Sequence, residues 1–133
     1  MGTYQNVWVE NLNKPIYIIL ASRSRLFLEG IRKILEDETG IKIVAEFLNR
    51  EEIERYTTII KPEFILLDNT TLELDINKLI GLINEKSLNT KVILLSGYSR
   101  YKSNSPNIIY IDKNIGPSEL VRTIIRSSPI NRI

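Results

Sequence analysis

Five short apolar runs, rich in β-branched side chains, set the framework of this chain. They are Ile16–Ala21, Ile41–Phe47, Phe64–Leu67, Val92–Leu95 and Ile108–Ile111. Their length and composition predict β-strands. Four of them are almost continuously apolar, as expected of strands that are buried on both faces of a parallel sheet. The run Ile41–Phe47 alternates in part, so we expect it at the edge of the sheet.

Segments of helical periodicity lie between these runs. Their apolar positions are Phe27, Ile31, Ile34 and Leu35, then Ile53, Tyr56 and Ile60, then Ile76, Leu79, Ile80 and Ile83, and finally Leu120, Val121, Ile124 and Ile125. Each set predicts an amphipathic helix. Residues 98–107 have no apolar stripe and favour turns, so we expect a loop or one helical turn there. The alternation predicts an α/β fold, with an open, doubly wound parallel sheet and right-handed crossovers.

The length of the chain fits one domain. With 133 residues and 43% hydrophobic content, it can bury one core. The βα pattern occupies residues 15–128, which we take as the domain, and residues 129–133 as a tail. Residues 1–14 have no place in the pattern and are interpreted as a leader or an added arm. Tyr4, Val7, Trp8 and Val9 make this arm a candidate for packing on a partner.

The composition excludes several classes of function. The chain has no cysteine and no histidine, which excludes disulfides, the usual zinc sites, and catalysis by thiol or imidazole. Its net charge of +2 is spread without a run of one sign, so we expect no direct binding of nucleic acid. The longest apolar stretch, Ile16–Ala21, is far too short to span a bilayer. We expect a soluble cytoplasmic protein that is not an enzyme.

Polar residues follow the predicted strands. In an open α/β sheet, ligands bind at the carboxyl ends of the strands, where the strand order reverses. The residues at those ends are Ser22 and Arg23, Asp68, Ser96, and Asp112 with Lys113. An aspartate, a hydroxyl group and a lysine that arrive at one edge from three strands would form a pocket for an acyl phosphate and its counter-charge.

Several motifs along the chain resemble those of one family. They are Ile18-Ile19-Leu20, Leu26-Phe27-Leu28-Glu29-Gly30-Ile31, Pro62-Glu63-Phe64-Ile65-Leu66-Leu67-Asp68, Val92-Ile93-Leu94-Leu95-Ser96-Gly97-Tyr98, and Lys113 followed by Pro117-Ser118-Glu119-Leu120. In this order they resemble the CheY-like receiver domain of response regulators, most closely that of LuxR/FixJ-type transcription regulators. The resemblance covers residues 15–127. It implies a flavodoxin-like fold with strand order 2-1-3-4-5.

The resemblance also implies roles for residues at the strand ends. Asp68 would be the phosphoacceptor, Ser96 the hydroxyl that turns toward the phosphoryl group, and Lys113 the cation that contacts it. Tyr110 would be the aromatic switch. Each residue also has a plain structural explanation: Asp68 as a turn or cap residue, Lys113 as a solvated lysine, and Tyr110 as a packed tyrosine.

Departures from the family pattern lie at the same pocket. The family holds Mg²⁺ with two acidic residues after the first strand, and this chain has Ser22 and Arg23 there. A guanidinium in this place opposes a metal ion, so we expect no cofactor and a lost Mg²⁺ site. Arg23 is hypothesised to pair with Asp68 in place of the metal. Two prolines of the family pattern are also replaced, by Leu72 and by Asn114, and the fourth helix is expected to be shortened or missing.

These departures predict a degenerate receiver, or pseudo-receiver. It would be a phosphorylation-independent regulatory or dimerisation module in bacterial two-component signalling or transcription control, with protein partners that include a second copy of itself. Two alternatives stay open. The first is a working receiver that a histidine kinase phosphorylates on Asp68. The second is a flavodoxin-like module that binds a small molecule, although residues 22–25 contain no glycine for a phosphate loop.

Overall fold

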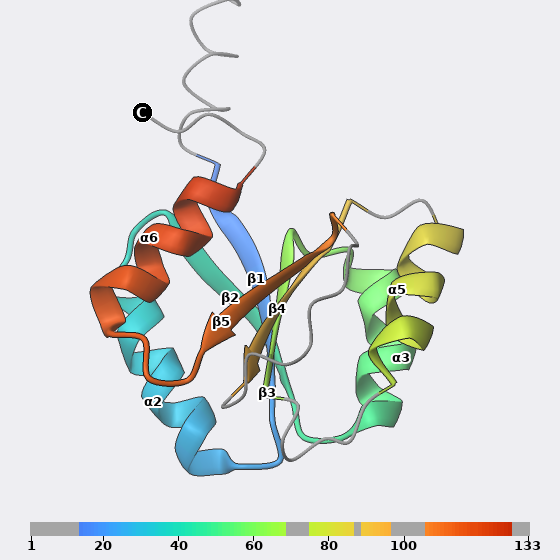
Figure 1. Ribbon diagram of the computed structural model, residues 1–133, viewed down its shortest axis with the longest axis horizontal. Helices are drawn as coiled ribbons and strands as arrows, with labels where there is room; N and C mark the ends of the chain where they lie inside the picture. The colour runs from blue at the N-terminus through green and yellow to red at the C-terminus, as the bar shows by residue number, and fades with distance from the viewer. Residues whose placement is uncertain (1–13, 69–74, 87–88, 97–105, 129–133) are drawn as a thin grey trace, which may run out of the picture.

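Strands and helices alternate along the chain (Figure 1). The computed structural model describes residues 14–68, 75–86, 89–96 and 106–128. The strands are β1 (Ile16–Ala21), β2 (Ile41–Phe47), β3 (Phe64–Asp68), β4 (Lys91–Ser96) and β5 (Ile108–Asp112). The helices in these ranges are α2 (Arg25–Glu36), α3 (Arg50–Ile60), α5 (Ile76–Glu85) and α6 (Pro117–Ser127). The five strands and four amphipathic helices expected from the sequence are therefore confirmed.

The five strands form one parallel sheet in the order β2-β1-β3-β4-β5. This order confirms the predicted flavodoxin-like, doubly wound fold. The expected loop or shortened fourth helix falls mainly within residues 97–105, outside the described part of the chain, and stays a prediction. The N-terminal residues 1–13 and the tail 129–133 also lie outside it. No helix in the described ranges is long and apolar enough to cross a bilayer.

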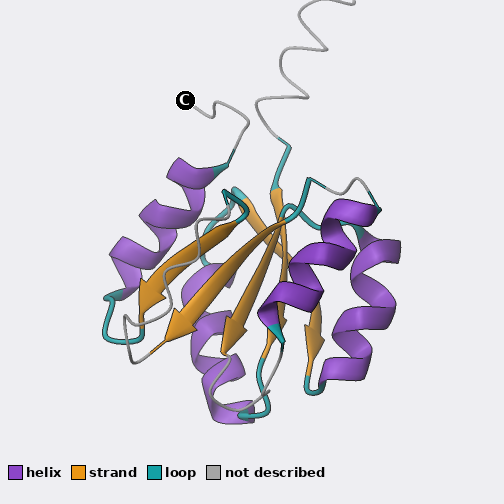
Figure 2. Cartoon of the chain, turned by 45° about the vertical axis from the view of Figure 1, so that its right-hand side comes forward, coloured by secondary structure: helices purple, strands orange, loops and turns teal. Residues whose placement is uncertain are grey.

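Helices cover both faces of the sheet, so the core has two layers (Figure 2). α2 and α6 contribute buried side chains to one layer, and α3 and α5 contribute to the other. Successive residues of a strand point to opposite faces, and the central strand β3 therefore serves both layers. Leu66 packs in the layer of α2 and α6, Leu67 packs in the layer of α3 and α5, and both are fully buried.

Side-chain caps fix where three of the helices begin. Ser24, Asn49 and Asp75 precede α2, α3 and α5, and each accepts a hydrogen bond from a backbone N–H in the first turn of its helix. α6 begins with Pro117, whose ring suits the first helical position. At the other end of α3, Lys61 takes the left-handed conformation, with φ of 52° and ψ of 59°. A lysine thus occupies a cap position that usually belongs to glycine.

A β-bulge in the edge strand β2 reverses the face of the sheet to which the later side chains of the strand point. Ile43 pairs with Ile18, whereas Ala45 pairs with the next residue of β1, Ile19, so Val44 is an extra residue. As a result Ile43 packs on the layer of α2 and α6, while Ala45 packs on the opposite layer. The edge position predicted for this strand is confirmed.

An ion pair links helix α2 to the edge strand β2. Two of the three guanidinium nitrogens of Arg32 donate to the Glu46 carboxylate, with Nε–Oε2 at 2.8 Å and Nη2–Oε1 at 2.7 Å. This hydrogen bonding, together with the opposite charge, raises the pKa of Arg32 further above its ordinary value. The two-pronged contact places Glu46 toward α2, as the bulge requires.

Polar contacts hold the end of α6 at the amino-terminal edge of the sheet. Lys91 Nζ, at the start of β4, donates to the Ser127 carbonyl oxygen at 3.2 Å. The Ser128 hydroxyl donates to the carboxylate of Glu63, which immediately precedes β3. A cation at a helix C-terminus satisfies carbonyl groups that have no partner inside the helix. The chain therefore leaves α6 at the edge of the sheet where β1 begins.

Candidate functional site

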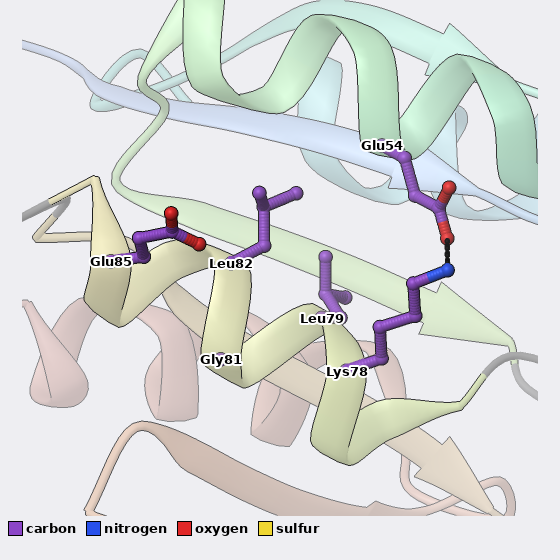
Figure 3. Close-up of a pocket in the computed structure, with 6 residues that line it drawn as sticks. All are labelled: Glu54, Lys78, Leu79, Gly81, Leu82 and Glu85. Carbon is purple, nitrogen blue, oxygen red and sulfur yellow. Dashed lines mark ion pairs between the residues drawn. The ribbon is translucent and has the colours of Figure 1, made fainter.

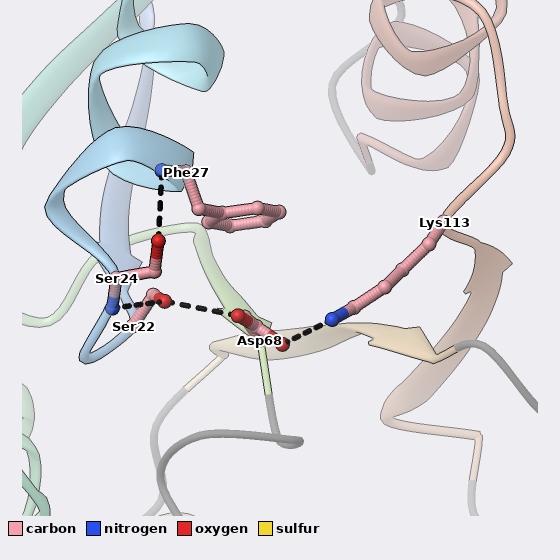
Figure 4. Close-up of polar contacts among 5 residues, drawn as sticks. All are labelled: Ser22, Ser24, Phe27, Asp68 and Lys113. Carbon is pink, nitrogen blue, oxygen red and sulfur yellow. Dashed lines mark hydrogen bonds and ion pairs between the residues drawn. The ribbon is translucent and has the colours of Figure 1, made fainter.

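The candidate site lies at the carboxyl edge of the sheet, where β1 and β3 end side by side. Ala21 pairs with Leu67 across these strands, so the next residues, Ser22 and Asp68, are neighbours. The Ser22 hydroxyl donates to Asp68 Oδ2 at 3.0 Å, and both residues are buried (Figure 4). The strand register thus places the serine that follows β1 directly against the aspartate that ends β3.

Lys113 reaches the same carboxylate from β5. β5 lies two strands away from β3, a distance of about 10 Å across the end of β4. The long side chain spans this gap, and its Nζ lies 2.8 Å from Asp68 Oδ1 (Figure 4). Its side chain is 32% exposed, whereas that of Asp68 is 3% exposed. The lysine therefore connects a buried carboxylate to the surface.

The burial of Asp68 explains why both contacts are needed. A carboxylate removed from water is strongly unfavourable unless it is paired and hydrogen-bonded. Ser22 and Lys113 meet this need from two different strands, with one contact to each carboxylate oxygen. Ser22 Oγ in turn accepts a hydrogen bond from the Ser24 backbone N–H at 2.9 Å. The start of α2 is therefore linked to the carboxylate through one hydroxyl group.

Phe27 is a further contact that the sequence analysis did not assign to the site. Its ring centroid lies 5.9 Å from Lys113 Nζ, within the range of a cation–π interaction. Phe27 N–H also donates to the Ser24 side chain, so the helix cap positions the ring (Figure 4). The available signal was the place of Phe27, four residues after Arg23 of the predicted pocket. It was read only as a core position of α2.

The other predicted pocket residues are placed as follows. Arg23 directly follows Ser22 and is exposed. Its hypothesised pairing with Asp68 stays a prediction. Ser96 ends β4 in register with Asp112 of β5, which puts its backbone at the carboxyl edge. Tyr110 is half-buried on β5 and packs on the layer of α3 and α5, and its role as a switch stays a prediction.

In the described part of this edge, few side chains offer oxygen atoms that could bind a metal ion. Within the described residues, no three His, Cys, Asp or Glu side chains gather closely enough to hold a metal ion. Asp112 ends β5, but it is exposed and accepts a hydrogen bond from the Asn114 backbone N–H at 2.8 Å. Among the described side chains, the contacts at the Asp68 carboxylate come from the Ser22 hydroxyl group and the Lys113 ammonium group. Mg²⁺ prefers several oxygen ligands with negative charge, so these side chains do not fit it.

Comparison by sequence finds no matching family model and no matching curated protein. Comparison by structure finds receiver domains. A response regulator receiver domain protein from Bacillus halodurans has a TM-score of 0.73 at 17% identity, covering 87% of this chain and 99% of that chain. The response regulator domain of Thermotoga maritima CheB has a TM-score of 0.71 at 18% identity, covering 89% and 99%.

A DNA-binding response regulator of the LuxR family from Staphylococcus aureus is also similar. Its TM-score is 0.70 at 20% identity, over 84% of this chain and 98% of that chain. These similarities span nearly the whole length of the three known domains. The strand order β2-β1-β3-β4-β5 of this chain, with helices on both faces of the sheet, agrees with that fold. The chain therefore has the CheY-like fold of response-regulator receiver domains.

Proposed function

We propose that this chain is a regulatory module of the receiver type that acts by binding protein partners, without metal-dependent phosphoryl transfer. It would serve in bacterial two-component signalling or transcription control, as a degenerate relative of phosphorylated receivers. The observation that carries the proposal is the contact between Ser22 and Asp68. A neutral hydroxyl group stands where a metal-binding acid is expected, and it occupies an oxygen of the carboxylate.

The chemistry of phosphoryl transfer explains why this contact matters. The transferred group carries negative charge on its oxygens, and it is stabilised by cations placed around it. Mg²⁺ supplies most of that charge in receivers that use it, while Lys113 brings a single positive charge that is already paired with Asp68. One buried carboxylate with a serine beside it is a weak magnesium site. We infer that Asp68 acts here as a structural partner of Lys113.

The direct test is intact-mass spectrometry after incubation with acetyl phosphate and Mg²⁺. The proposal expects no phosphoryl adduct on the wild-type chain. An adduct that forms on the wild type and is absent from Asp68→Asn would contradict the proposal and establish a phosphorylated receiver.

If the wild type forms no adduct, a variant with two acidic residues restored at the end of β1 tests whether their loss is the reason. Ser22→Asp combined with Arg23→Asp returns two acids to the end of β1, beside Asp68. We expect this double variant to gain Mg²⁺ binding, seen as a rise in Tm on addition of Mg²⁺ that the wild type lacks. At a metal concentration 100 times Kd, binding stabilises the folded state by about 2.7 kcal/mol. The matched control adds Asp68→Asn to the double variant and should abolish the gain. Equal responses of wild type and double variant would mean that the acids are not what is missing.

The pair between Lys113 and Asp68 favours a second candidate function. A lysine 2.8 Å from a buried aspartate is also suited to contact a phosphoryl group on that aspartate. In this candidate a histidine kinase phosphorylates Asp68 and the remaining groups suffice. The acetyl phosphate experiment separates the two candidates, because only the second predicts an adduct that depends on Asp68.

The proposed partners include a second copy of the chain. Apolar side chains stay exposed on β2 and on α3, with Val44 at 37%, Tyr56 at 38% and Ile59 at 69%. Exposed apolar groups that lie close together favour a protein-binding face over a solvated one. Sedimentation at increasing protein concentration tests the dimer, and Ile59→Glu should weaken it. A monomer at all concentrations would remove the homodimer from the proposal and leave other protein partners.

A further inference from the structure

A groove lies between α3 and α5, away from the Asp68 site (Figure 3). Its volume is about 470 Å³. Its lining residues are Glu54, Lys78, Leu79, Gly81, Leu82 and Glu85. Nearly all of them belong to α5, and only Glu54 comes from α3. The two helices cover the same face of the sheet, so the groove runs along the outer side of one core layer.

The wall of the groove combines two leucines and a glycine with three charged side chains. Leu79 and Leu82 point from α5 toward the α3 side (Figure 3). Gly81 adds no side chain, and nothing lies within 4 Å of the place where its Cβ would be. The ion pair of Lys78 with Glu54, at 3.8 Å, crosses the groove near the end where α5 begins. Glu85 lines the opposite end of the groove, where α5 ends.

The start of the described chain lies at the same edge of the sheet as the Glu85 end of α5. The Glu63 N–H donates to the Tyr17 carbonyl oxygen at 2.9 Å, and the Lys91 N–H donates to the Glu63 carbonyl oxygen at 3.0 Å. β1 and β4 therefore begin two strand spacings apart, about 10 Å. α5 ends at Glu85 and leads within a few residues to Lys91. The chain before Lys14 thus enters near the Glu85 end of the groove.

We propose that the N-terminal arm, residues 1–13, docks in this groove with Trp8 as its anchor. The arm contains Tyr4, Val7, Trp8, Val9 and Leu12. Trp8 precedes Lys14 by six residues, which span at most about 20 Å when extended. The two strand spacings together measure about 10 Å, and the packed layer between the sheet and the helices is about 10 Å thick. Because these two distances are perpendicular, they combine to roughly 15 Å. Trp8 can therefore reach Gly81 and Leu82, while a much shorter arm would not.

The covalent link between the arm and the domain favours the arm over a separate molecule as the occupant of the groove. A segment attached by a short linker has an effective concentration in the millimolar range at a site it can reach. A second copy of the chain, or an unrelated peptide, must reach that concentration in solution to compete. Burial of a tryptophan side chain against Leu82 would offset the ordering of a short arm. The occupant is thus the arm of the same molecule.

Trp8 is the single tryptophan of the chain, so its fluorescence reports on the arm alone. We expect the emission of the full chain to lie to the blue of a peptide of residues 1–14, with acrylamide quenching several-fold weaker. Gly81→Leu fills the groove and should return both values to those of the peptide. Emission and quenching of the wild type equal to those of the peptide would overturn the proposal.

Gly30→Leu is the matched control. Gly30 is also exposed within a helix with nothing near its Cβ position, but it lies on α2, which covers the other face of the sheet. Leucine favours the helix at both positions, so neither variant should unfold. Urea midpoints no lower than that of the wild type verify this. The proposal expects Gly30→Leu to leave Trp8 protected, and equal effects of the two variants would contradict it.

A dilution series separates the arm of the same molecule from that of a second copy. Protection of Trp8 that persists on dilution supports docking within one molecule. Protection that is lost on dilution would overturn it in favour of an exchange of arms between two copies. Leu82→Lys gives a second variant at the wall of the groove, and it should expose Trp8 as Gly81→Leu does.

Discussion

Asp68 shows how one buried charge is satisfied by groups from distant parts of the chain. Ser22 and Lys113 lie 46 and 45 positions away in sequence, yet each contacts one oxygen of its carboxylate. A partly exposed cation and a buried hydroxyl group contribute in different ways. The cation balances the charge, while the hydroxyl group supplies a hydrogen bond that water cannot reach to replace.

The first prediction concerns the lysine. Lys113→Met leaves the Asp68 carboxylate buried without its cation, and we expect a loss of about 2 kcal/mol in the free energy of unfolding. Urea unfolding at pH 7 measures it. Arg122→Met is the control, since it breaks the ion pair with Glu119, in which both side chains are more than half exposed. That change should cost less than about 1 kcal/mol. Similar losses for the two variants would mean that Asp68 does not depend on Lys113.

The sequence predicted which residues would meet at this edge, but not the contacts between them. Ser22, Asp68 and Lys113 follow strands, and parallel strands bring their carboxyl ends together. Ser22 was interpreted as a lost acid, and its hydrogen bond to Asp68 was not foreseen because such a bond depends on register. Phe27 was missed because an aromatic residue in an apolar stripe is most often a core residue.

At the level of single elements, the end of α3 carries local strain. Lys61 adopts the left-handed conformation in which a side chain crowds the backbone. Helix α5 ends differently, because its C-cap Lys86 has φ of −88°. The two lysines therefore occupy the same kind of position with different backbone requirements.

This pair gives a second prediction. Lys61→Gly should raise the free energy of unfolding by about 1 kcal/mol, because glycine adopts the left-handed conformation without the crowding of a Cβ. Lys86→Gly should lower it by about 0.5–1 kcal/mol, since glycine there only adds freedom to the unfolded chain. Midpoints of urea unfolding compare the two. A loss of stability in both variants would show that the Lys61 conformation carries no strain.

The strands and helices were predictable from periodicity, while their local irregularities were not. The run Ile41–Phe47 shows a partial alternation that predicts an edge strand, and β2 is one. The extra residue at Val44 leaves no local mark in the sequence, because Ile43 and Ala45 have the spacing of residues on one face. The structure places them on opposite faces, and the strand pairing with β1 decides this.

The whole molecule depends on a sheet that is covered on both sides. Leu66 and Leu67 are adjacent in β3, and each is fully buried in a different layer. A sheet with one exposed face would make one of two such neighbours tolerant of change. In this chain neither is expected to be tolerant.

The third prediction follows from this arrangement. Leu66→Ala and Leu67→Ala should each lower the free energy of unfolding by about 2–5 kcal/mol, since both leave a cavity in a packed layer. Leu26→Ala, at a side chain that is 82% exposed, should change it by less than about 0.5 kcal/mol. Denaturant unfolding of the three variants tests this. A mild effect at either core position would contradict burial of the sheet on both faces.

The α/β class and the strand order were within reach of the sequence for a physical reason. Runs that are apolar throughout require cover on both faces, and right-handed crossovers leave few arrangements of five strands. The specific order came from the family resemblance, and the structure confirms it. The groove between α3 and α5 was not predictable, because it depends on the distance between two helices, which the periodicity of the sequence does not specify.

The contacts of Lys91 with Ser127 and of Ser128 with Glu63 have a practical consequence. They direct the chain out of α6 at the edge where β1 begins, opposite the edge that holds Asp68 (Figure 1). A linker for a resin or a sensor surface can therefore be attached beyond either described end, and the edge of the sheet that holds Asp68 will face the solution. For fluorescence work on the arm, the label belongs after residue 128, so that residues 1–13 stay native.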